Sequence, residues 1–239
     1  MNGCSNAGDV KRGSMIGGLV ILAIGLMISD SALAHGVAQG DKGFIQSSSG
    51  VMLAPFIYIG AKHMVTGYDH ILFLLGVVFF LYRLKDVSLY VSLFAIGHSV
   101  TLILGVLGGI SVNAYVVDAI IGFSVVYKAL DNLGAFEKWF GRELDARKAT
   151  LIFGLLHGLG LATKVMDYDI SPDGLIANLL AFNVGVELGQ ILALSLILMV
   201  MTLWRMSSRF GAQAKIANLV LMTAGFMLMG YQTAGFYLS

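Results

Sequence analysis

Six apolar runs separated by short polar breaks are the feature that most constrains the fold of this chain. They cover residues 71–84, 87–107, 115–133, 149–165, 175–204 and 216–238. Charged residues make up 12% of the chain and hydrophobic residues 57%, whereas a soluble domain carries roughly 25% charge. This composition excludes a soluble globular domain, and the high hydrophobicity excludes a disordered chain. The pattern predicts an all-α, polytopic membrane helix bundle with six transmembrane helices.

The N-terminus has the pattern of a secretory signal peptide. Lys11 and Arg12 precede an apolar run over residues 15–28, and small residues follow from Ser31 to Ala34. An uncleaved first helix is the alternative, but the run is shorter than the ~20 residues of a typical span. We therefore predict cleavage after Ala34.

Cleavage there predicts three parts of the chain. They are a signal peptide over 1–34, an exported polar tail over 35–50 and a six-span transmembrane domain over 51–239. Cys4 is the only cysteine and would leave with the signal peptide. The mature protein would then have neither a disulfide framework nor a thiolate metal site.

The first apolar run, at 71–84, is short for a span, and the segment before it is only partly apolar. Residues 51–70 contain Pro55, Gly60 and Gly67. They either extend the first helix as a broken helix or form a re-entrant half-helix. Irregular backbone at membrane depth is tolerated only where protein or a watery cavity covers it. The segment therefore points to a site near residues 63–70.

The polar breaks predict the orientation of the spans. Basic and non-basic breaks alternate along the chain, as the positive-inside rule requires of successive loops. The basic breaks carry Arg83 and Lys85, then Lys138, Arg142, Arg147 and Lys148, then Arg205, Arg209 and Lys215; residues 108–113 carry no charge, and Asp167, Asp169 and Asp173 make the remaining break acidic. We expect a protein of the bacterial inner membrane with both mature termini on the exported side. The net charge of +1 gives no reason to expect a nucleic-acid partner.

Ionisable residues inside a bilayer are costly and indicate function, and the first such cluster is His63, Asp69 and His70. The two histidines are seven residues apart, which places them on one face of a helix. Imidazole and carboxylate ligands suit a divalent ion such as nickel, cobalt, zinc or iron. Asp69 is either a ligand or the partner that orients a histidine. The alternative is a hydrogen-bonded cap where the chain enters the membrane.

Two further histidines lie inside apolar runs, each beside glycines. His98 follows Gly97, and His157 lies between Gly154 and Gly158. Glycines allow helices to approach closely, so these histidines either make ordinary interhelical hydrogen bonds or line a metal site.

A polar stripe on one helix is the last candidate. Asn183, Glu187 and Gln190 follow one another at i, i+4 and i+7. We interpret the stripe as part of an ion path or proton relay rather than as packing.

These residues resemble the HupE/UreJ family of membrane proteins, which is associated with nickel supply to hydrogenases and ureases. The family signature H-x5-D-H matches His63, Asp69 and His70, and the segments 97–102, 156–160 and 182–190 are also similar. The resemblance covers about residues 50–235. It implies a six-span inner-membrane permease or accessory protein for nickel or cobalt. Where one branch of the family has a closing glutamate, this chain has Lys164.

The sequence therefore predicts a divalent-metal permease without enzymatic activity and without a prosthetic group. Its partners would be the lipid bilayer, the transported ion and either a membrane protein or a second copy. A non-transporting assembly or metal-handling protein is the alternative, and a membrane metalloenzyme is a weaker one because no H-E-x-x-H motif is present. The predicted metal-site residues are His63, Asp69, His70, His98, His157, Asn183 and Glu187.

Overall fold

The computed structural model describes residues 14–23, 39–142, 145–167 and 171–238, and all regular secondary structure within them is helical. Residues Ser14–Ala23 form a short helix. The other helices are α2 (Gln39–Ser47), α3 (Leu53–Thr66), α4 (Tyr68–Val78), α5 (Leu84–Gly108), α6 (Ala114–Asn132), α7 (Ala135–Phe140), α8 (Ala146–Met166), α9 (Leu175–Arg205) and α10 (Phe210–Leu238). The predicted all-α class is confirmed.

Four helices of the described chain are long and apolar enough to cross a membrane, namely α5, α8, α9 and α10. The predicted spans at 115–133 and 71–84 correspond to α6, with 19 residues, and α4, with 11. Helix α4 ends at Val78, so the first predicted run extends six residues beyond the helix, to residue 84. The predicted signal peptide is described only over residues 14–23, and its cleavage site lies outside the described residues.

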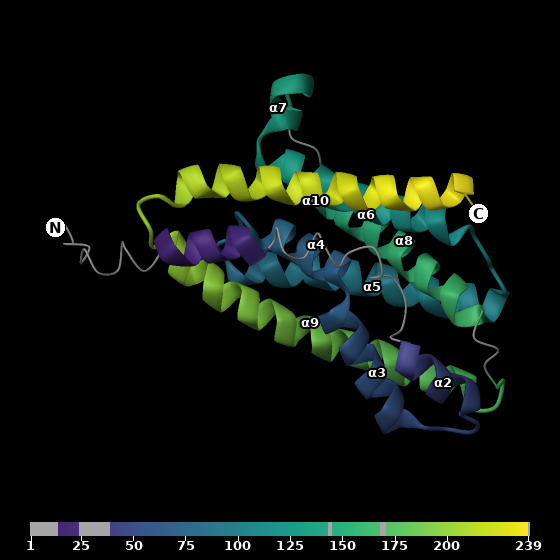
Figure 1. Cartoon of the computed structure of the whole chain (residues 1–239). Helices are drawn as coiled ribbons and strands as arrows, with labels where there is room; N and C mark the ends of the chain where they lie inside the picture. The colour runs from purple at the N-terminus through teal and green to yellow at the C-terminus, as the bar shows by residue number, and fades with distance from the viewer. Residues whose placement is uncertain (1–13, 24–38, 143–144, 168–170, 239) are drawn as a thin grey trace.

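The bundle is built from three closely packed helix pairs, α5 with α8, α6 with α10 and α3 with α9. Figure 1 shows α10 running alongside α6, with α3 and α9 on the opposite side of the bundle. Glycines set the distance within the pairs. A Cβ atom at Gly60 would lie 2.0 Å from the carbonyl oxygen of Phe182, and one at Gly122 would lie 2.7 Å from the backbone nitrogen of Met229. The backbones of paired helices therefore touch directly.

Two apolar cores fill the space between the pairs. One core joins α4, α6 and α10 to the last turns of α9, around Trp204 and Leu221. The other joins α2, α3, α5 and α8 to the first half of α9, around Phe182 and Leu161. Ile45 anchors α2 in this second core, so the predicted exported tail at 35–50 contains a packed helix.

Side-chain hydrogen bonds tie the helices together at each end of the bundle. At one end, Arg205 donates to the carbonyl oxygens of Val78 and Phe79 at 2.5 and 3.1 Å. At the other end, the amide group of Asn178 donates to the carbonyl oxygen of Gly50 at 2.9 Å. The three basic breaks of the sequence gather at the first end, and the uncharged and acidic breaks lie at the second, where α6 begins and α8 ends.

Helix α8 begins in one of the basic breaks, where Asp145 accepts hydrogen bonds from the backbone nitrogens of Lys148 and Arg147. These bonds satisfy two amides at the start of the helix and favour the carboxylate. The pKa of Asp145 is lowered, chiefly by the bond from Lys148.

Candidate metal centre

The candidate site is built first on the break between α3 and α4. Gly67 is the single residue between the two helices, in an extended conformation, and its N–H donates to the carbonyl oxygen of His63 at 2.9 Å. The predicted interruption of the helix before residue 71 is thus present, at Gly67. The break places His63 in the last turn of α3 and Asp69 and His70 in the first turn of α4.

Gly67 also makes room for the side chains that follow it. A Cβ atom at this position would lie 2.5 Å from Nδ1 of His70 and 3.1 Å from Oδ1 of Asp69. A larger residue would displace both groups, so the packing of the site requires a glycine at this position.

His98 and His157 enter the site from α5 and α8, whose backbones touch at three glycines. A Cβ atom at Gly158 would lie 2.1 Å from the carbonyl oxygen of His98. Cβ atoms at Gly97 and Gly154 would lie 2.7 and 2.4 Å from backbone oxygens of the opposite helix. The glycines beside these histidines therefore let the two helices approach until both imidazoles reach one space.

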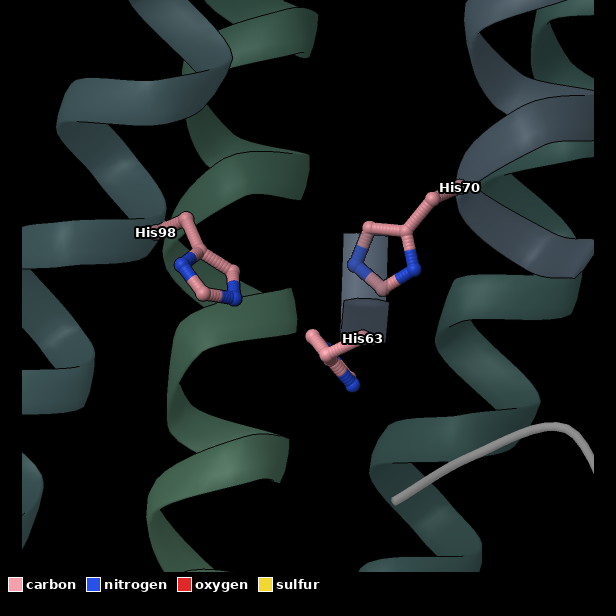
Figure 2. A group of neighbouring side chains, drawn as sticks. All are labelled: His63, His70 and His98. Carbon is pink, nitrogen blue, oxygen red and sulfur yellow. The ribbon is translucent and has the colours of Figure 1, made fainter. Parts of the chain in front are cut away.

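The structure brings together the four histidines and Asp69, each no more than 3% exposed. They form two groups that share His70, the first with His63 and His98 and the second with Asp69 and His157. Within each group, one candidate ligand atom per residue lies within 4.8 Å of the others. Figure 2 shows His63, His70 and His98 directed into the same space from α3, α4 and α5. To bind one ion, the side chains of either group would need to move only a little.

Hydrogen bonds orient two of the imidazoles. Nδ1 of His157 lies 2.8 Å from the carbonyl oxygen of Phe153. A carbonyl only accepts, so Nδ1 carries the proton and neutral His157 keeps the lone pair of Nε2 for a metal. Nδ1 of His70 lies 3.1 Å from Oδ1 of Asp69, which favours the same tautomer. The second oxygen of Asp69 lies 4.0 Å from Nε2 of His157.

Aromatic rings line the site on the side that faces the core around Trp204 and Leu221. The ring of Phe94 lies 4.9 Å from that of His157 and 6.2 Å from that of His70, and Phe73 lies 6.1 Å from His157. Neither phenylalanine was among the residues predicted from the sequence. Phe94 precedes His98 by one helical turn, and that spacing was the available signal. The apolar wall lowers the local dielectric and strengthens the attraction of the donors for a cation.

The polar stripe on α9 is divided by the structure. Asn183 and Gln190 are buried, and their amide groups donate to the carbonyl oxygens of Leu179 and Val91. The side chain of Glu187, four residues after Asn183, is exposed. Glu187 belongs to neither group of candidate ligands.

Comparison with known families agrees with the resemblance of the motifs. The sequence model of a family described as HupE / UreJ protein matches residues 39–239. No curated protein and no solved structure matches the chain.

Proposed function

Because the chain belongs to the HupE/UreJ protein family, we propose that it is an inner-membrane permease for a divalent transition metal, nickel or cobalt. The ion is the substrate, and it binds transiently to His63, Asp69, His70, His98 and His157. This donor set, buried and drawn from four helices, is the observation that carries the proposal.

The chemistry of the site supports a metal ion. Burial takes four imidazoles and a carboxylate out of water at a cost in free energy, and a bound cation would offset part of that cost. Imidazole nitrogen with carboxylate oxygen suits nickel, cobalt and zinc better than magnesium or calcium. The family association with nickel narrows the choice to nickel and cobalt.

The depth of the site supports transport. His157 lies eleven residues into the 21-residue helix α8, and His98 fourteen residues into the 25-residue helix α5. An ion between them would be near the middle of two membrane-spanning helices, which is where transporters hold their substrates. We propose six spans, formed by α3 with α4, and by α5, α6, α8, α9 and α10, with the basic breaks in the cytoplasm and the C-terminus on the exported side.

The uptake of radiolabelled nickel tests the proposal in a strain that lacks its own nickel and cobalt importers. We expect uptake by the wild type, competed by cobalt, and background uptake by His70→Ala and Asp69→Asn at equal protein levels. His35→Ala is the matched control, since His35 is the one histidine that is not among the metal-site residues predicted from the sequence, and it should transport normally. Normal uptake by the two site variants would show that the cluster is not on the transport path.

Glu187 supports a second candidate, a non-transporting partner of another membrane complex. This carboxylate is exposed on α9 among exposed apolar residues such as Val184, Leu188 and Ile191. A carboxylate facing lipid is costly, and a partner helix with a hydrogen-bond donor would relieve the cost. Nickel flux into proteoliposomes that contain only this protein favours the permease, whereas binding without flux favours the partner.

A further inference from the structure

A second polar site lies between α6 and α8, on the proposed exported side of the histidine cluster. The ammonium group of Lys164 lies 2.6 Å from Oδ2 of Asp118. Only 16% of the lysine side chain and 7% of the aspartate side chain are exposed.

The position of this pair relates it to the cluster. Lys164 follows His157 by seven residues, so the two share a face of α8 and lie about 10 Å apart along its axis. Lys164 is also only two residues from the end of the helix at Met166. The pair therefore stands between the cluster and the end of the bundle from which the ion would enter.

Stability alone does not account for the pair. Removing two charges from water costs about as much as their attraction returns, so a buried ion pair stabilises a protein little relative to apolar residues. The carboxylate of Asp118 is, however, an oxygen ligand suited to a divalent cation. The ammonium group of Lys164 occupies the position that such a cation would take beside it.

We infer that Asp118 is an outer cation subsite on the entry route to the cluster, and that Lys164 competes with the arriving ion for it. This inference rests on the proposed transport function. A divalent ion carries twice the charge of the lysine and displaces it from the carboxylate. The displaced ammonium group then repels the ion, which favours its onward movement to the imidazoles.

The inference requires the two residues to act in opposite directions. Lys164→Met keeps the length of the side chain and removes the competitor, so the KM for nickel should fall. Asp118→Asn keeps the shape and removes the subsite while the lysine charge stays, so KM should rise. We expect about tenfold in each direction, which corresponds to about 1.4 kcal/mol of binding free energy. A merely structural pair would instead make both variants worse in the same way.

The experiment measures KM and maximal uptake rate per protein, together with the Kd of nickel for the purified proteins in detergent. Lys128→Met is the matched control, because it removes a lysine from a comparable pair with Asp131 at the opposite end of the bundle, and its KM and Kd should equal those of the wild type. Opposite shifts of the two variants in KM or Kd support the subsite, and shifts of the same sign or no shift overturn it. The two proposals can fail separately. Uptake by the wild type tests the permease, whereas the Kd values of the variants are measured on purified protein and do not depend on transport.

Discussion

Single residues shape the candidate metal centre, and the glycines matter as much as the candidate ligands. His98 and His157 reach one space only because α5 and α8 touch at Gly97, Gly154 and Gly158. The imidazoles supply the donor atoms, and the glycines allow the helices that carry them to approach closely.

We expect Gly158→Ala to destabilise the protein and weaken nickel binding. The new Cβ atom would meet the carbonyl oxygen of His98 at 2.1 Å and Oγ1 of Thr101 at 2.3 Å. The two helices must separate to admit it, and overpacking of this kind costs about 1–3 kcal/mol. Thermal denaturation in detergent, with and without nickel, measures both effects.

Gly230→Ala is the control for that substitution. Gly230 is a helical glycine of α10, and a Cβ atom at this position would have no neighbour within 4 Å. Alanine favours a helix over glycine by about 1 kcal/mol, so this variant should be as stable as the wild type or more stable. Equal melting temperatures for the two variants would contradict the close contact at Gly158.

The candidate site could be predicted from the sequence only where ligands are close in the chain. His63, Asp69 and His70 lie within eight residues of the chain, so their proximity was informative, although the helix predicted to carry both histidines on one face breaks at Gly67. His98 and His157 each allowed a packing interpretation, because no local pattern shows that α5 and α8 meet. Glu187 lies about 40° around the helix from Asn183, which is enough to expose it once Gly185 and Gly189 turn towards α3.

At the scale of elements, the short helix α4 depends on side chains from other helices. Val78 and Phe79 at its end are fully buried, so their carbonyl oxygens cannot be hydrated. Arg205 of α9 donates to both of them, and Asn132 of α6 donates to the carbonyl oxygen of Gly76. The apolar run continues past Val78, so the sequence carried no signal for this end, and tertiary contacts set it.

We expect Arg205→Met to destabilise the protein by about 1–3 kcal/mol, the cost of leaving the buried carbonyl group of Phe79 without this donor, whereas the carbonyl group of Val78 keeps the bond from the N–H of Leu81. Methionine retains much of the apolar length of the side chain, so the loss would come from the hydrogen bonds and from the contact with the ring of Tyr82. Arg209→Met removes a charge from the next turn, where the side chain is exposed, and should be nearly neutral. Chemical denaturation of both purified variants measures the difference, and equal stabilities would refute the capping role.

At the scale of the whole molecule, the chain sorts its charges between the two ends of the bundle. The basic breaks near Arg83, Lys148 and Arg209 follow helices that run in the same direction, and the contacts of Arg205 and Asn132 draw those ends together. The sequence predicted this alternation because the charge of each break depends only on the residues of that break. For residues 51–70 it left two alternatives open, a broken helix and a re-entrant half-helix, since neither α3 nor α4 alone is long enough to span a bilayer.

The crossing of α3 with α4 can be tested with single cysteines, because Cys4 is the only native cysteine. In a Cys4→Ser background, we place cysteine at Ser49 before α3, at Ser111 between α5 and α6, and at Ser208 between α9 and α10, all exposed. With six spans, a membrane-impermeant maleimide should label positions 49 and 111 in cells whose outer membrane is permeable, and position 208 only after the inner membrane is opened.

Detergent-treated membranes give the total label for each variant. Five crossings separate positions 49 and 208 if α3 and α4 cross together, so the two positions lie on opposite sides of the membrane. Only four separate them if α3 and α4 do not cross. Labelling of 49 together with 208 would therefore contradict the crossing by α3 and α4. Labelling of 111 together with 208 would instead reject the crossings by α6, α8 and α9 that bring His157 to the middle of the membrane.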